Sequence, residues 1–149
     1  MDNIKAESYK HFQKRQQEEY NSLPVMYAFG NKQFEEGMKK LGLTVNDVDK
    51  IFSIGAGGYI KKTDSHLLDA VTENRITEFE SAIKSDTTGE GFCFQMFNFE
   101  LGNHEYSYTH EIEPTLDALG LTMDDIRANP AMEHGLRMAL REQRLQHGI

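Results

Sequence analysis

A glutamate and a histidine four residues apart are the first candidates for chemistry in this chain. Glu100 and His104 occur in the stretch FELGNHEYSYTHEIE, and His110 follows shortly after them. Residues four apart share one face of a helix, so a metal site could be built from these three side chains and a later carboxylate. The zincin pattern of two histidines four apart with an adjoining glutamate is absent. Such a Glu–His pair more often ties a helix end to a loop, so the sequence predicts no metal and no cofactor.

A glycine-rich stretch, SIGAGGYIKK, is the second candidate. A P-loop needs Gly-Lys-Ser/Thr after its glycines, but Tyr59 and Ile60 follow Gly58 here. The dinucleotide-binding pattern is also incomplete, because its third glycine is missing at that spacing. The stretch instead predicts a β-hairpin around residues 51–61, with GAGG as a four-residue loop. An alternative interpretation of this stretch is an anion-binding concavity, formed by glycine amides and nearby lysines. Its residues would be Gly55, Gly57, Gly58, Lys61 and Lys62.

The chain contains one cysteine, Cys93, within GFCFQMF. One cysteine excludes an intramolecular disulfide and a multi-cysteine zinc site. Its aromatic neighbours predict a buried, unreactive thiol. No Ser–His–acid or Cys–His arrangement stands out, so we expect no catalytic residues. An enzyme or ligand sensor that uses the glycine loop or the Glu100–His104 pair is the alternative function.

The charge of the chain is unevenly distributed. The net charge is −8, yet residues 64–125 contain fourteen acidic and two basic residues. Such a segment repels free nucleic acid and attracts a basic surface, so we expect a basic protein partner, such as a nucleic-acid-binding host protein. The expected partner-binding residues are Glu111, Glu113, Asp117, Asp124 and Asp125.

Hydrophobic periodicity predicts a mainly α protein. We expect a surface helix within residues 1–23, followed by a single globular helical domain over residues 24–149 that forms a compact bundle with the one hairpin. The stretch FCFQMFNFELGNHEY reads as a helix or a bulged strand, and its spacing favours the helix. Asn31 is the expected N-cap of a second helix. Asn129 followed by Pro130 predicts the start of the last helix, whose inward side chains would be Met132, Leu136, Ala139 and Gln143.

The motif Leu-Gly-Leu-Thr occurs twice, at residues 41–44 and 119–122, with an aspartate three residues after each threonine. Gly42 and Gly120 can take the left-handed conformation that closes a helix. Each threonine would then cap a following short helix. The second short helix contains two aspartates where DNA phosphates would lie, so these repeats predict structural corners and not DNA readout.

The chain shows no signal-peptide pattern, and no stretch approaches the ~18 apolar residues of a membrane span. These features predict a cytoplasmic protein that does not contact a membrane.

Four stretches together resemble a family of small acidic proteins from gut and related bacteria. They are AFGNKQFEEGMKKLGL, SIGAGGYIKK, ELGNHEYSYT and TLDALGLTMDDI, and the resemblance covers roughly residues 20–145. The resemblance implies a setting on phages, plasmids and conjugative elements, and it implies no activity or fold. In that setting, the charge pattern favours a macromolecule-binding module, for example an anti-defence inhibitor that occupies the basic groove of a host nuclease. A structural role within the mobile element is a third hypothesis.

Overall fold

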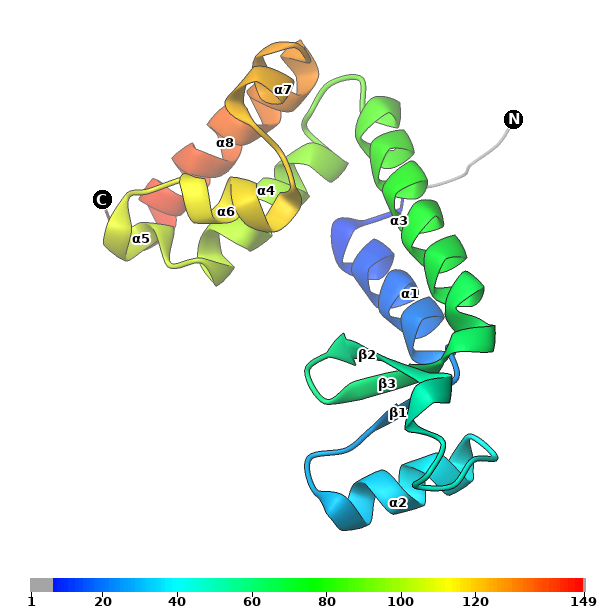
Figure 1. Cartoon of the computed structure of the whole chain (residues 1–149). Helices are drawn as coiled ribbons and strands as arrows, with labels where there is room; N and C mark the ends of the chain where they lie inside the picture. Colours follow the sequence, from blue (N-terminus) through cyan, green and yellow to red (C-terminus); the bar gives the residue numbers. More distant parts are fainter. Residues whose placement is uncertain (1–6, 149) are drawn as a thin grey trace. The chain divides into compact units, whose positions relative to one another are not determined.

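The computed structural model describes residues 7–148, and these are mainly helical with one small sheet (Figure 1). This confirms the predicted fold class and the predicted hairpin. The helices are α1 Tyr9–Asn21, α2 Asn31–Lys40, α3 Ser65–Ser85, α4 Phe92–Asn103, α5 Tyr106–Thr109, α6 Glu113–Leu119, α7 Met123–Arg127 and α8 Pro130–His147. The strands are β1 Val25–Tyr27, β2 Ile51–Gly55 and β3 Gly58–Lys61, and short 3-10 helices cover Val48–Lys50 and Lys62–Asp64.

The chain forms two compact units. Within the described residues, the sheet unit comprises 15–77, and the helical unit comprises 7–14 together with 78–148. Helices α1 and α3 contribute to both. Of the helix expected within residues 1–23, the first six residues lie outside the described part, and the boundary expected after residue 23 stays a prediction.

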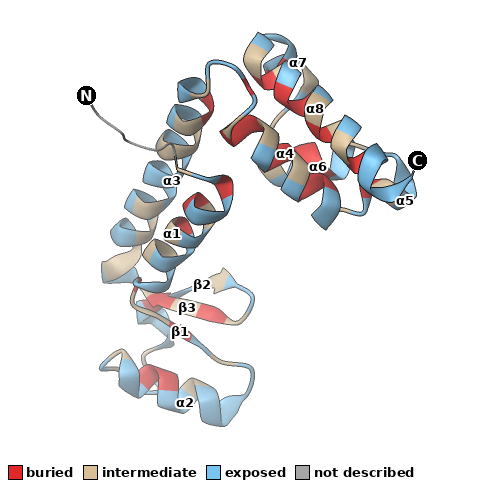
Figure 2. Ribbon diagram, turned by 180° about the vertical axis from the view of Figure 1, so that it is seen from behind, coloured by how far each residue is buried: buried red, intermediate tan, exposed pale blue. Residues whose placement is uncertain are grey.

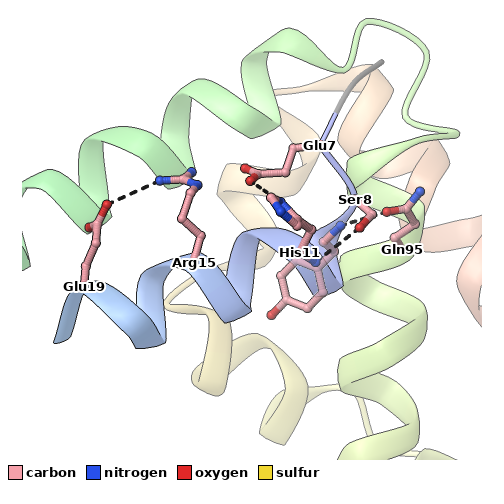
Figure 3. A network of polar contacts seen from close by, with 7 residues as sticks. Glu7, Ser8, His11, Arg15, Glu19 and Gln95 are labelled. Carbon is pink, nitrogen blue, oxygen red and sulfur yellow. Dashed lines mark hydrogen bonds and ion pairs between the residues drawn. The ribbon is translucent and has the colours of Figure 1, made fainter. Parts of the chain in front are cut away.

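Local polar contacts connect successive turns of α1 (Figure 3). At its start, Nδ1 of His11 lies 2.6 Å from a carboxylate oxygen of Glu7. Further along, Arg15 lies 3.5 Å from Glu19. Both pairs are spaced four residues apart, the separation at which side chains meet on a helix surface. The inner face of α1 is apolar, with Tyr9 and Phe12 buried.

The sheet is antiparallel with strand order β1-β3-β2. Its β1 strand was not expected from the sequence. One face of the sheet packs on α2, where Met26, Met38 and Ile51 form a small core. The rings of Phe34 and Tyr59 meet edge to face at 5.6 Å beside this core. The face with Met26 and Tyr59 therefore packs on α2, and Ile60, which points to the opposite face of the sheet, is fully buried as well.

The prediction that Asn31 caps α2 is wrong by one residue. Gly30 is the N-cap, with φ −171° and no side-chain hydrogen bond, and Asn31 is the first helical residue. Gln33 instead accepts the backbone N–H of Phe29 at 2.8 Å. This contact attaches the residue before the N-cap to the first turn of α2.

The hairpin turn is shorter than the predicted four-residue loop. Gly55 pairs with Gly58 across the strands, so only Ala56 and Gly57 form the turn. Their φ angles are 51° and 78°, and positive φ at both central residues is the signature of the type I′ turn that fits twisted strands. An ideal Cβ on Gly57 would also lie 2.5 Å from the ring of Phe29, an exposed side chain that would have to shift.

Helices α4 and α8 form the centre of the helical unit. Figure 2 shows buried residues on both helices. The segment FCFQMFNFELGN is helical, as the sequence favoured, and Phe97 and Leu101 are fully buried. The cap of α8 is also as predicted, because Asn129 accepts the N–H of Met132 at 3.2 Å. All four predicted inward residues of α8 are buried: Met132, Leu136, Ala139 and Gln143.

Both Leu-Gly-Leu-Thr corners close a helix. Gly42 and Gly120 have φ of 76° and 67°, and the leucine after each donates its N–H five residues back, the bond of a Schellman stop. Only the second corner leads into the expected α-helix, α7, through a complete capping box of Thr122 and Asp125. After Thr44 the chain makes a turn and then a 3-10 helix, so the prediction of a short helix there holds only in this tighter form.

No helix in the described part of the chain combines the length and apolar character that crossing a membrane requires.

Candidate functional site

The five acidic residues expected to bind a partner all lie on the surface of the helical unit. Glu111 lies in the loop before α6, α6 carries Glu113 and Asp117, and α7 carries Asp124 and Asp125. All five are exposed. We call residues 111–125 the acidic segment. No lysine or arginine occurs between Lys84 and Arg127, so no basic residue interrupts it along the chain.

Two of these five carboxylates have a contact within the protein, and that of Asp125 is structural. Asp125 accepts the backbone N–H of Thr122 at 2.9 Å as part of the capping box. Asp124 lies 3.7 Å from Arg127, although both side chains are mainly exposed. Within the acidic segment, some carboxylates therefore make contacts inside the protein and others do not.

Glu111, Glu113 and Asp117 are the remaining three. Within residues 7–148 the structure gives them no ion pair. Glu113 and Asp117 are four residues apart on α6, where like charges repel and destabilise the helix by a few tenths of a kcal/mol. The opposite side of α6 buries Thr115 and Leu116. This geometry holds two carboxylates together on the solvent side, and a cationic partner would relieve their repulsion.

An exposed tyrosine lies on α5, shortly before the acidic segment. Tyr108 is 88% exposed, whereas Tyr106 of the same short helix is buried. The residues before and after α5, Glu105 and His110, both have positive φ, at 58° and 57°. Non-glycine residues at positive φ are uncommon and carry a conformational cost. The chain thus holds a strained, short helix that presents one aromatic ring to solvent, and an exposed tyrosine can stack on a cationic side chain.

The glycine hairpin does not bring its two lysines to the glycine turn. Lys61 ends β3, three residues after Gly58, a separation of roughly 10 Å along a strand. Its ammonium lies 4.0 Å from Asp64. Lys62 lies over the ring of Phe52 at 5.2 Å from its centre. Lys61 and Lys62, the two cations of the alternative anion-binding interpretation, therefore already have partners at the end of the hairpin away from the turn.

Glu100 and His104 do lie together. Nε2 of His104 is 3.3 Å from one carboxylate oxygen of Glu100. The other oxygen accepts the phenol of Tyr9 at 2.9 Å and the side-chain amide of Gln13 at 3.3 Å. Glu100 is buried, and the pair thus connects α4 to the first turns of α1.

The phenol of Tyr9 stays protonated in this network. Burial raises its pKa above the usual value, and the hydrogen bond to Glu100 and the carboxylate charge raise it further. The tyrosine can therefore act as a donor throughout the neutral range.

His110 does not join this network. It lies at the end of α5, where its ring is 6.0 Å from that of Tyr106. Among residues 7–148 no three His, Cys, Asp or Glu side chains come together in a way that could hold a metal ion.

Cys93 is fully buried, as expected. Burial raises the pKa of its thiol to about 12, with a smaller contribution from Asp86. A thiol with such a pKa is almost wholly protonated at neutral pH, so it is a poor nucleophile.

Sequence reasoning missed Asp86, which stabilises the start of α4. Its carboxylate accepts backbone N–H groups of Gly89, Gly91 and Cys93 at 3.0, 3.2 and 2.9 Å. Burial alone would raise its pKa, but these hydrogen bonds outweigh burial and hold the pKa below its usual value. The signal was present in DTTGEG, since an aspartate followed by glycines before an apolar helix is a capping pattern.

These features define a small, mainly helical protein with an exposed acidic segment at residues 111–125. The chain belongs to a family of unknown function, DUF7659, whose sequence model matches residues 8–142. That range includes all of α1, so the first helix is part of the family region, whereas the resemblance had been expected to begin near residue 20. Comparison with curated proteins and with solved structures gives no match.

Proposed function

We propose that the protein is a binding module that occupies a basic surface of another macromolecule through its acidic segment. The unrelieved pair of Glu113 and Asp117 on α6 carries this proposal. The repulsion between these two carboxylates lowers the stability of α6 slightly, so without a binding role they are a small net cost. A basic partner would convert that local cost into a favourable, charge-complementary contact.

Tyr108 adds a second kind of contact to the same proposal. Aromatic side chains are enriched among the residues that dominate binding energy. An arginine or lysine of the partner could stack on its ring while its neighbours meet Glu111 and Glu113. The expected partner surface is therefore basic and rich in arginine.

On a phage, plasmid or conjugative element, the concrete form of this function is inhibition of a host defence nuclease. The groove of a nuclease is basic because it binds phosphates. A segment with many carboxylates and no lysine or arginine can compete for that groove. The mobile-element setting and the nuclease target are parts of the proposal, supported by the charge pattern and by the resemblance.

The Glu100–His104 pair supports an enzymatic function less well. Both oxygens of Glu100 already accept hydrogen bonds or an ion pair from Tyr9, Gln13 and His104. This arrangement is typical of a buried carboxylate that fastens two helices.

Charge reversal tests the proposal. The double variant Glu111→Lys/Asp117→Lys changes two exposed carboxylates outside the capping box, and it spares the Asp125 cap. The measurement is the amount of partner that tagged protein captures from lysate of the native host, quantified by mass spectrometry at low and high salt. We expect the double variant to lose the partner, and wild-type capture to fall as salt rises past the ~10 Å screening length reached near 0.1 M.

A matched control separates this effect from net charge. Glu73→Lys/Glu80→Lys makes the same change in net charge at two exposed positions of α3. This control should retain the partner. Equal capture by wild type and the Glu111→Lys/Asp117→Lys variant, with no salt dependence, would remove the acidic-segment proposal.

A further inference from the structure

The outer face of α8 carries a row of arginines. Arg137, Arg141 and Arg144 are four and three residues apart, so they share one face of the helix, and all three are exposed. The opposite face of α8 is buried against the other helices of its unit. We call these three residues the arginine row. No other lysine or arginine occurs between residues 128 and 149, so the permanent positive charge of this stretch is gathered on one exposed helix face.

Two of these guanidinium groups are open to a partner. Arg137 pairs with Glu133 of the same helix. Arg141 and Arg144 have no ion pair within the part of the chain that the structure describes. A guanidinium can donate two parallel hydrogen bonds to one carboxylate, which makes arginine well suited to ion pairs across interfaces. Leu145 is 68% exposed next to Arg144 and supplies apolar surface at the same place. This face of α8 therefore fits an acidic partner.

We propose that the arginine row binds the acidic segment of a second copy of this chain. Glu113 and Asp117 are four residues apart on α6, and Arg141 and Arg144 are three residues apart on α8. Side chains at either spacing start ~5–6 Å apart, so each of the two carboxylates can meet one guanidinium group. The contact relieves the repulsion between the two carboxylates. The inference rests on the proposed role of the acidic segment as a site for basic surfaces, and it names one such surface.

Size and charge select a second copy as the occupant. The row from Arg137 to Arg144 extends over roughly 10 Å of helix, and α6, with seven residues, is equally short. A nucleic acid or an anionic membrane presents phosphates over a much larger area, and the net charge of −8 opposes such an extended contact. The net repulsion between two copies is screened beyond ~8 Å at physiological ionic strength, whereas paired charges lie closer than that. Within one copy, the described residues form no ion pair between α6 and α8, so both surfaces are open.

The test is the molar mass in solution, measured by sedimentation equilibrium over a range of concentrations at ~0.15 M salt. We expect the average mass of wild type to rise above the 17.1 kDa of one chain as concentration increases. Arg141→Glu/Arg144→Glu reverses the charge of the row, and Glu113→Arg/Asp117→Arg reverses the charge of the surface that it meets. Each double variant should raise the dissociation constant at least tenfold. An equimolar mixture of the two variants should restore association, because each contact then joins opposite charges again.

Two controls accompany these variants. Lys39→Glu/Lys40→Glu makes the same change in net charge as reversal of the row, at two exposed positions of α2, and it should leave self-association unchanged. Circular dichroism establishes that each variant is folded. If reversal of the row prevents folding, the neutral variant Arg141→Gln/Arg144→Gln takes its place and should raise the dissociation constant at least threefold.

The outcomes separate this inference from the proposed function. A wild-type chain that is monomeric up to ~1 mM overturns the self-association. Association that reversal of the row leaves unchanged also overturns it, as does a mixture of the two folded variants that stays monomeric. Capture of a basic host partner needs the acidic segment but not the row, so Arg141→Glu/Arg144→Glu should retain it. Capture by a monomeric wild type would overturn only this inference, and self-association without capture would overturn only the proposed function.

Discussion

The phenol oxygen of Tyr9 lies 2.9 Å from Oε1 of Glu100 and joins residues 91 positions apart in the chain. Both residues are buried. The backbone N–H of Tyr9 also donates to the side-chain oxygen of Gln95, at 2.8 Å. Two hydrogen bonds from one residue thus attach the start of α1 to α4, and the first of them satisfies a buried carboxylate.

The variant Tyr9→Phe should therefore lower the free energy of unfolding. Removal of the hydroxyl takes one donor from buried Glu100, and an unsatisfied buried acceptor costs ~1–3 kcal/mol. Because Gln13 and His104 remain near the carboxylate, we expect about 1 kcal/mol, measured by urea unfolding at neutral pH. Tyr108→Phe is the control, since that phenol is in water and its loss should change stability by no more than ~0.5 kcal/mol.

The same variant has a signature at high pH. The folded-state pKa of Tyr9 is raised, so its stabilising effect is complete below the unfolded pKa of ~10 and is lost as pH rises further. The stability difference between wild type and Tyr9→Phe should shrink above ~pH 10. A constant difference from neutral to alkaline pH would show that the phenol proton plays no part in this contact.

Two glycines in the packed pair of helices should respond to alanine with opposite signs. An ideal Cβ on Gly135 of α8 would lie 2.6 Å from the carbonyl oxygen of Gly89 and 2.9 Å from Cβ of Cys93. Backbone atoms cannot move aside easily, so Gly135→Ala should cost ~1–3 kcal/mol through overpacking. At Gly102 of α4, the nearest atom would be Nε2 of Gln143 at 3.8 Å, an ordinary contact.

Gly102→Ala should accordingly stabilise the protein by up to ~1 kcal/mol, because alanine has the higher helix propensity. Thermal and urea unfolding of the two variants make the comparison. If Gly135→Ala were as stable as wild type, α4 and α8 would not pack as closely as the structure shows.

Local signals in the sequence predicted those elements that local interactions decide. Asn129 and Pro130 specified the start of α8 because a cap and its helix are neighbours in the chain. The glycines specified a hairpin because positive φ is a property of single residues. The length of the turn was wrong, since Gly55 pairs within the ladder, and pairing is not a single-residue property.

Non-local partners explain the features that were missed. Strand β1 has only three residues, which is too short for a periodic pattern to predict it. It is defined by its pairing with a distant segment, as in the pair Val25–Ile60. The Glu100–His104 contact was predictable from spacing, whereas its completion by Tyr9 required the fold. Exposure of Asp117 followed from the apolar face of α6. The spacing of Thr122 and Asp125 placed the aspartate at the start of α7, but its hydrogen bond in the capping box required the structure.

The variant Asp86→Asn should destabilise the start of α4 in a pH-dependent way. Asparagine retains one acceptor oxygen, but its amide nitrogen cannot accept from backbone N–H groups. At neutral pH we expect a loss of ~1 kcal/mol, because partly buried N–H groups lose an acceptor. Since the folded-state pKa of Asp86 is lowered, the stability that it contributes is present above the unfolded pKa of ~3.9 and is lost as pH falls through the lower folded value.

The difference between wild type and Asp86→Asn should thus be largest near neutral pH and shrink as pH falls through the lowered folded-state pKa of Asp86, below which the carboxylate is protonated in both states. Urea unfolding over this pH range measures it. The control is Glu90→Gln, whose carboxylate lies 3.6 Å from His134 at an exposed position and should contribute at most ~1 kcal/mol. A loss for Asp86→Asn that is the same at every pH would mean that the shape of the side chain, and not its charge, stabilises the helix start.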